Sequence, residues 1–279
     1  MTFFRPGVGK IIFLFVAFVL TTFILGGFIL NGLLRFPPQV ANVIVIIAIL
    51  LITRQAYKSE GKGLAELGLN VNFKNIGFSL LGFFIGGLFI IPLVYLIAYI
   101  RGYPVVFNQA FNGAYVLSGL WLLLPTVVLE ELAFRGICFK KTIEITGVAK
   151  ANLIFAVLFI LSHWINGGVF GDPVAMTVLL ITGLGHLLYA TAFLKSKTLY
   201  FPIGIHLGGN WMTYFVFSNY NLKSPLYGEL KPSLINVVSN DIPLFNGLFI
   251  LQIIVTALAF VLFTLAIRKW IHTREKLAV

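Results

Sequence analysis

The sequence predicts an all-helical, polytopic membrane protein with about eight transmembrane helices. Of the 279 residues, 59% are apolar and only 10% are charged, whereas soluble domains are about one quarter charged. Long apolar runs alternate with short polar segments that carry most of the Lys and Arg residues. The single cysteine, Cys138, excludes an internal disulfide framework and a cysteine-rich metal site.

Eight apolar segments have roughly the length of the bilayer core, which a helix of about 20 residues crosses. They cover residues 11–34, 40–53, 76–100, 115–139, 151–165, 174–194, 199–218 and 245–270. The second and fifth are short, and we expect the fifth to be held inside the bundle. The connection 219–244 contains Pro225, Pro232 and Pro243, which predicts irregular structure with at most short helices. No internal repeat interrupts the pattern, so we expect residues 1–279 to form a single membrane domain.

The positive charges predict the orientation. With an even number of spans both termini lie on one side of the membrane, together with sixteen of the twenty Lys and Arg residues. Only Arg35, Arg101, Lys223 and Lys231 fall on the other side. Because cytoplasmic loops carry the excess of Lys and Arg, we expect a multi-pass protein of the cell membrane with both termini in the cytoplasm. The net charge of +11 is spread between spans, which argues against nucleic-acid binding.

Two adjacent carboxylates, Glu130 and Glu131, lie near the end of the fourth apolar segment, in a chain with only nine acidic residues. Each costs about 2.5 kcal/mol or more at the centre of a bilayer, so such residues are functional candidates. Glu131 and Arg135 are four residues apart and can pair on one helix face. Glu130 points about 100° away and is free to accept a proton. The alternative is that the three residues form a polar cluster that only holds the fold.

Two further polar motifs lie on other predicted spans. His163 follows Phe159 by four residues, and His206 precedes Asn210 by four, so each pair shares a helix face. We counted depth from the cytoplasmic end of each span, at about 1.5 Å per residue. The depths are about 13 Å for Glu130, 17 Å for His163, 10 Å for His206 and 16 Å for Asn210. The three segments are therefore expected to bring these side chains to a similar level.

Two other features lie on the same predicted spans as, or next to, these motifs: a third histidine and a pair of glycines. His186 would lie at a similar depth, about 12 Å, but has no polar partner at helical spacing, so a direct role for it stays open. Gly204 and Gly208 form a pair of small residues four apart. Such pairs allow two helices to approach closely in lipid.

These groups suit peptide hydrolysis without a covalent intermediate. A carboxylate and a histidine on neighbouring helices can hold and deprotonate a water molecule. A second histidine and an asparagine on one helix face can donate hydrogen bonds to an oxyanion. The sequence has neither a His-Glu-x-x-His nor a Gly-x-Ser-x-Gly motif. Glu130, His163 and His206 could instead hold zinc, and the residues alone do not separate a bare water from a zinc-bound one.

Taken in order, the three motifs resemble those of a known family. Glu-Glu-x-x-x-Arg at 130–135, Phe-x-x-x-His at 159–163 and His-x-x-x-Asn at 206–210 are similar to the motifs of the CPBP intramembrane proteases. That family includes CAAX-processing endopeptidases of the Rce1 type and bacterial members tied to bacteriocin immunity. The motif-bearing core covers about residues 115–218, and the first three spans and the last carry no matching motif.

The resemblance implies a role for each motif residue. Glu130 and His163 would activate the water, and His206 and Asn210 would stabilise the oxyanion. Three further residues would support the site: Glu131, Arg135 and Phe159. The resemblance also implies a conical catalytic cavity within the bundle, which opens to the cytoplasm. Glutamate-dependent hydrolysis without a cofactor is favoured, and a metal-dependent form stays open.

The implied function is endoproteolysis of a membrane-associated substrate, either a prenylated or another hydrophobic peptide, in contact with membrane lipids. The main alternative is a non-catalytic immunity or scaffold protein of the same fold, which would bind a peptide or a partner. A transporter would use the buried charges as a relay, but transporters often contain inverted repeats, and none is evident. The sequence sets neither the identity of the substrate nor the oligomeric state.

Overall fold

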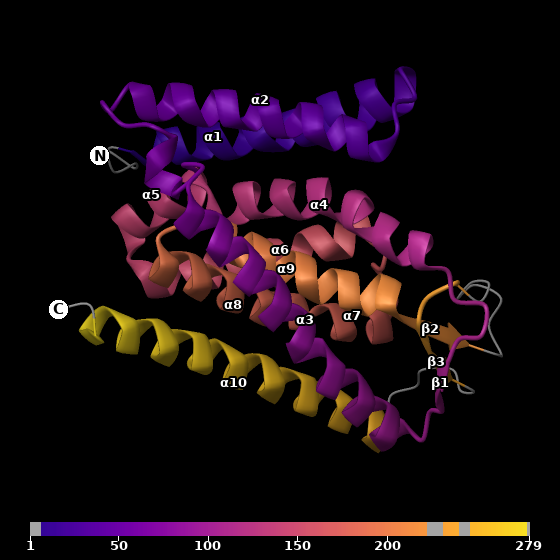
Figure 1. Cartoon of the computed structure of the whole chain (residues 1–279). Helices are drawn as coiled ribbons and strands as arrows, with labels where there is room; N and C mark the ends of the chain where they lie inside the picture. Colours follow the sequence, from indigo (N-terminus) through magenta and orange to yellow (C-terminus); the bar gives the residue numbers. More distant parts are fainter. Residues whose placement is uncertain (1–6, 222–230, 240–245, 278–279) are drawn as a thin grey trace.

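The computed structural model describes residues 7–221, 231–239 and 246–277, and within them it confirms a polytopic helical protein (Figure 1). The elements in the first half are α1 (Val8–Leu20), η1 (Thr21–Leu33), α2 (Pro38–Lys58), η2 (Leu64–Leu67), α3 (Phe73–Arg101), β1 (Val105–Phe107), α4 (Gly113–Arg135) and α5 (Ile137–Thr146). Those in the second half are α6 (Val148–Asn166), α7 (Pro173–Leu179), α8 (Ile181–Ser196), α9 (Tyr200–Trp211), η3 (Met212–Val216), β2 (Phe217–Asn221), β3 (Ile235–Ser239) and α10 (Gly247–Leu277).

Seven helical segments in the described ranges are long and apolar enough to cross a membrane. They are Val8–Leu33, Pro38–Lys58, Phe73–Arg101, Gly113–Thr146, Val148–Asn166, Pro173–Ser196 and Gly247–Trp270. The predicted span 199–218 is the exception. There α9 has 12 residues, the five-residue π-helix η3 follows, and the chain then turns into β2. The eighth pass is therefore a shorter helix, which the longer helices surround.

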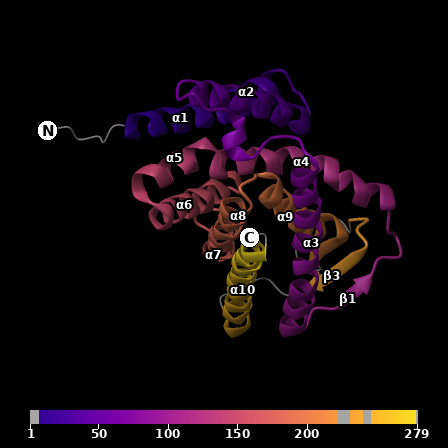
Figure 2. The same cartoon turned by 60° about the vertical axis from the view of Figure 1, so that its left-hand side comes forward.

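The bundle has two distinct ends. The start of α1 and the end of α10 lie together at the left of Figure 1, and we call this the terminal end. The strands lie at the opposite end, which we call the sheet end. The helix pair of α1 with η1 and α2 forms an outer layer over α4 and α5 in both views (Figures 1 and 2). A buried stripe of α2 at every fourth residue holds this layer to the core: Ala41, Val45, Ile49, Thr53 and Tyr57.

Ion pairs at the terminal end tie this outer layer to α5. Glu60, just after α2, lies 2.6 Å from Lys10 of α1 and 2.6 Å from Lys141 of α5. Hydrogen bonds from these two ammonium groups lower the pKa of Glu60 to about 2. Glu66 accepts a hydrogen bond from Lys140 over 3.1 Å, which lowers the pKa of its carboxyl.

The closest helix contact joins α3 to α9. A Cβ atom on Gly204 would collide with the Ser79 carbonyl oxygen, and one on Gly208 with the Phe83 carbonyl oxygen. Gly86 of α3 meets the Ile205 carbonyl oxygen in the same way. The small residues of α9 thus allow the two backbones to touch, as the spacing of Gly204 and Gly208 predicted.

A small sheet at the sheet end corrects the expectation of irregular structure over residues 219–244. The strand order is β1-β3-β2, with β1 antiparallel and β2 parallel to β3. Val105 pairs with Val237, and Phe217 pairs with Ile235. Of the three prolines behind that expectation, Pro225 and Pro243 lie outside the described residues. Strand β3 pairs with β1 across more than a hundred residues of sequence, and local turn signals do not reveal such a partner.

Candidate active site

A buried ion pair on α4 anchors the candidate site. The Arg135 Nη1 atom lies 3.1 Å from Glu131 Oε1, and both side chains are fully buried. The guanidinium also stacks on the rings of Phe159 and Tyr189, at 4.4 and 5.0 Å from the two centroids. A buried charge needs a partner with good geometry, and the predicted pairing of Glu131 with Arg135 supplies it.

His206 of α9 lies between the two carboxylates. Its Nδ1 atom is 2.8 Å from Glu131 Oε1, and its Nε2 atom is 3.7 Å from Glu130 Oε2. Because Glu131 is paired with Arg135 and can only accept, Nδ1 carries the hydrogen of this bond. The ring stacks on Tyr189, with centroids 4.5 Å apart and planes 16° from parallel. The imidazole is therefore fixed in orientation, with Nε2 directed towards Glu130.

His163 is oriented by its own helix, α6. Its Nδ1 atom lies 2.8 Å from the Phe159 carbonyl oxygen, which accepts but does not donate. Nδ1 therefore carries the hydrogen, and Nε2 holds the lone pair of the neutral ring. The Phe159 ring meets the His163 ring edge to face, with centroids 4.5 Å apart. This confirms that the two residues share a helix face, as their spacing predicted.

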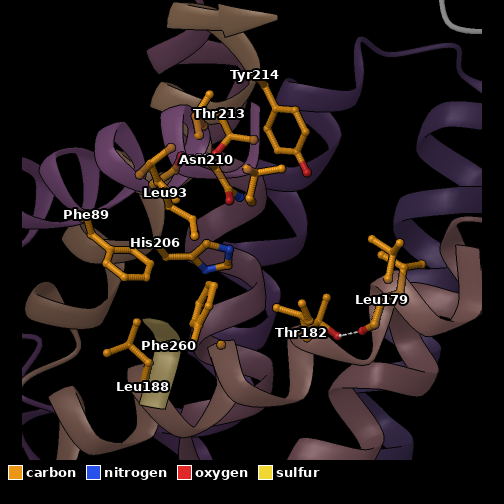
Figure 3. A pocket seen from close by; sticks show the side chains of 18 of the residues that line it. Phe89, Leu93, Leu179, Thr182, Leu188, His206, Asn210, Thr213, Tyr214 and Phe260 are labelled. Atoms are coloured by element: carbon orange, nitrogen blue, oxygen red, sulfur yellow. Dashed lines mark hydrogen bonds between the residues drawn. The ribbon is translucent and has the colours of Figure 1, made fainter. Parts of the chain in front are cut away.

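A cavity of about 760 Å³ brings the four predicted catalytic residues together: Glu130, His163, His206 and Asn210. This volume lies within the range of about 300–1,000 Å³ that is typical of ligand pockets. In Figure 3 the side chains of His206, Asn210, Thr213 and Tyr214 follow one another from the centre of the view towards its upper edge. Glu130 is partly accessible, with 28% of its side chain exposed, so the carboxylate can meet a ligand in the cavity.

The cavity extends towards the sheet end. On α3 its lining runs from Gly86, in the middle of the helix, to Arg101, the last residue, and Val237 and Ser239 of β3 also line it. Among the described residues, none of α3 before Gly86 lines the cavity. The cavity thus runs away from the end where α1 begins and α10 ends.

His186 lies behind the cavity rather than in it. It is fully buried, and its ring packs against the rings of Phe139, Phe155 and Phe159, with centroids 5.5 to 6.3 Å away. Neither ring nitrogen has a hydrogen-bond partner among the described residues. The structure gives His186 a packing position on the far side of Phe159.

Sequence reasoning missed two contacts of the site. The bond between Glu131 and His206 joins residues 75 positions apart, and no local spacing reveals it. Tyr189, which lies between the His206 ring and the Arg135 guanidinium, carries no motif. The similar depth of the motif residues pointed to the closeness of α4 and α9, and no sequence signal pointed to Tyr189.

The expected zinc ligands do not form a three-ligand group in this arrangement. Among the described residues, no three His, Cys, Asp or Glu side chains lie close enough together to hold a metal ion. Glu130 and His206 approach each other, but His163 does not complete a set with them.

Residues 112–212 match a family model described as Rce1-like, the type II CAAX prenyl endopeptidase Rce1-like family. No curated protein and no solved structure matches the chain. The Rce1-like segment runs from the start of α4 to the end of α9 and contains every motif residue named above. The similarity over this segment supports an enzyme of the protease type, and helices α1 to α3 and α10 lie outside the matched segment.

Proposed function

We propose that the protein is an intramembrane endopeptidase that hydrolyses a peptide bond of a prenylated or otherwise hydrophobic peptide. The observation that supports this most strongly is the meeting of Glu130, His163, His206 and Asn210 in one cavity. These residues come from three helices and lie inside the segment that matches the Rce1-like family.

The first step is attack by water. The Glu130 carboxylate and the His163 Nε2 lone pair both accept hydrogen bonds, so together they can hold one water molecule and orient it. Glu130 takes a proton as the water oxygen bonds to the carbonyl carbon of the scissile peptide. The same proton then passes to the leaving nitrogen as the carbon–nitrogen bond breaks, which restores the carboxylate and releases an acid and an amine.

The second requirement is stabilisation of the oxyanion. The Asn210 amide can donate one hydrogen bond, and His206 can donate a second from Nε2. Since Nδ1 of His206 already donates to Glu131, this role requires hydrogens on both nitrogens of the ring. The Glu131–Arg135 pair then holds the imidazole in place, while Phe159 separates His163 from Arg135 and fixes both.

The experiment is a comparison of membrane peptides from cells that produce the wild-type protein or the Glu130→Gln variant. New peptide ends that appear with the wild type and disappear with Glu130→Gln would identify substrates. Glu144→Gln serves as the matched control, because Glu144 is half exposed and pairs with Lys141 away from the cavity. If the Glu130→Gln profile equals the wild-type profile, the assignment of Glu130 as the proton acceptor is wrong.

Two further properties belong to this proposal. Synthetic peptides with and without a prenyl group distinguish a CAAX-type substrate from another hydrophobic peptide. Metal analysis of the active protein, with activity measured before and after chelation, distinguishes a bare water from a zinc-bound one.

We also propose that both termini are cytoplasmic, from the distribution of Lys and Arg. Reporter fusions at the C-terminus test this orientation.

A further inference from the structure

A second cavity lies in the outer layer of the bundle, between α1 and α2, and we call it the α1–α2 cleft. Its volume is about 550 Å³, within the range that is typical of ligand pockets. It shares no lining residue with the candidate active site. The apolar part of its lining comes from both helices: Phe13, Leu14 and Ala17 of α1, and Leu51, Ile52 and Ala56 of α2.

The cleft opens towards the surrounding membrane. Helices α1 and α2 lie on the outside of the bundle in both views (Figures 1 and 2). Leu14 is buried, whereas Phe13 and Leu51 on the two walls are 69% and 59% exposed. From Leu51 to Ser59 the lining rises by about 12 Å, at 1.5 Å per residue, which is less than half of a bilayer core of about 30 Å. The cleft therefore lies within one leaflet, where the neighbouring molecules are lipids.

The two ends of the cleft differ in chemistry. Towards the sheet end, a Cβ atom on Gly26 would lie 2.9 Å from Val45 Cγ2, so η1 and α2 pack closely beyond the cleft. At the terminal end, the Lys10 ammonium crosses to α2. It donates hydrogen bonds to the Ala56 carbonyl oxygen and to the Ser59 hydroxyl, each over 3.2 Å. The cleft is thus apolar along its length and polar only where α2 ends.

Positive charge is in excess at this polar end. Four cations, Lys10, Arg54, Lys58 and Lys62, accompany a single carboxylate, Glu60, which pairs with Lys10 and lies 4.0 Å from Lys62. Arg54 and Lys58 are exposed, and in the part of the chain that the structure describes neither forms an ion pair. Because they are four residues apart on one helix, these two cations repel each other. An anion beside them would offset that repulsion.

We propose that the α1–α2 cleft binds an anionic glycerophospholipid, with an acyl chain in the cleft and the phosphate beside Lys58 and Arg54. Lys58 follows the lining residues Leu51 and Gln55 by seven and three positions, so it lies on the same side of α2. Cationic side chains at a membrane surface attract anionic lipids, and they donate charge-assisted hydrogen bonds to a phosphate. The proposal does not depend on the proposed proteolysis, and it holds for either orientation of the termini.

The test compares phosphatidylglycerol with phosphatidylcholine that has the same acyl chains, because only the first lipid has a net negative charge. Each lipid is titrated into the purified full-length protein in detergent, and native mass spectrometry counts the bound molecules. Lys58→Gln removes one unpaired cation beside the cleft. Lys150→Gln is the matched control, since Lys150 is also exposed and lies at the start of α6, away from the cleft.

We expect the wild type to bind phosphatidylglycerol at least about fivefold more tightly than phosphatidylcholine, since each cation near the surface contributes about that factor. Lys58→Gln should lose most of this preference, and Lys150→Gln should keep it. Equal affinities of the wild type for the two lipids would overturn the proposal. So would equal preferences in Lys58→Gln and Lys150→Gln.

A second pair of variants tests the apolar part of the cleft. Ala17→Phe fills it and should abolish the binding of both lipids. Val16→Phe adds the same ring on another side of α1, where Val16 is 46% exposed, and should bind them like the wild type. Equal lipid binding by these two variants would contradict the proposed position of the acyl chain. If Ala17→Phe does not fold, the comparison of Lys58→Gln with Lys150→Gln still decides.

Two other occupants of the cleft are distinguished in the same experiments. Displacement of phosphatidylglycerol by an excess of inorganic phosphate would mean that the cations bind a free anion rather than a lipid. Conversion of a dimer into a monomer by Ala17→Phe, with no change in lipid binding, would mean that a second copy of the chain covers the cleft. Either result would overturn the proposal.

Discussion

The two halves of the bundle differ in how they are packed. In the terminal half, α3 and α9 touch through glycines, and the largest hydrophobic core cluster extends through α5 and the starts of α6 and α9, around residues such as Ile137, Phe155 and Leu199. In the sheet half, the same helices enclose a cavity of about 760 Å³. The candidate catalytic residues lie at the boundary. The difference suggests a division of roles, in which the packed half fixes the side chains and the hollow half receives the ligand.

The largest stability effect is expected where a buried charge loses its partner. Arg135→Met leaves the Glu131 carboxylate buried without its cation, which should lower the free energy of unfolding by about 3–5 kcal/mol. Unfolding in detergent micelles measures this. The double variant Glu131→Leu with Arg135→Met is the control, and it should be more stable than Arg135→Met alone because no unpaired charge remains. Equal stability of the single and double variants would show that the pair is not buried as described.

Alanine substitutions at two adjacent glycines compare the stability of the closely packed half with that of the hollow half. Gly208→Ala places a methyl group against the Phe83 carbonyl oxygen, whereas in Gly209→Ala the nearest atoms are 3.9 Å away. We expect Gly208→Ala to lower the free energy of unfolding by about 1–3 kcal/mol and Gly209→Ala to leave it nearly unchanged. Thermal unfolding of both variants in the same detergent gives the comparison. Similar midpoints for the two would contradict the tight contact between α3 and α9.

The stack of Tyr189 on His206 gives a smaller effect at the boundary. Tyr189→Leu removes the aromatic contact, which is worth about 0.5–1.5 kcal/mol, and should slow cleavage up to about tenfold. Tyr189→Phe keeps the ring and should retain most of the wild-type rate. The ratio of kcat to KM for a substrate found with the wild type measures both. Equal losses in the two variants would mean that the hydroxyl, not the stack, is what matters.

The smallest effect is expected from the ion pairs at the terminal end. Because Lys10 and Lys141 lower the pKa of Glu60 from 4.5 to about 2, its contribution to stability is complete above about pH 4.5. It is lost as the pH falls from there towards 2. Glu60 is partly exposed, so the contribution is on the order of 0.2–1 kcal/mol. Glu60→Gln should therefore show a weaker decline of the melting temperature between about pH 5 and pH 3 than the wild type. An identical decline would exclude this role.

Much of the helical structure could be predicted from sequence because helix geometry is local. The pairing of Glu131 with Arg135 and the shared face of Phe159 and His163 both follow from a spacing of four residues. The approach of α9 to another helix followed from Gly204 and Gly208. The length of the eighth pass did not follow from the sequence, because α9 ends at Trp211 and the chain then passes through η3 into β2.

The features that sequence reasoning missed all join distant parts of the chain. The hydrogen bond from His206 to Glu131 depends on how α9 packs against α4, and Tyr189 enters the site from α8. The sheet unites β1, β2 and β3, which lie more than a hundred residues apart at the extremes. The direction of the cavity depends on where α3 and α9 touch and where they part, which residue patterns within one helix do not determine.

The most direct test of the central claim is the cleavage rate of purified protein with a substrate identified from membrane peptides. Wild type, Glu130→Gln and the control Glu144→Gln are compared in the same detergent or lipid. A positioned proton acceptor contributes about 10²–10⁴-fold to a rate. Glu130→Gln should therefore cleave at least about a hundredfold more slowly while keeping its melting temperature, and Glu144→Gln should match the wild type. Cleavage by Glu130→Gln at the wild-type rate would contradict the claim.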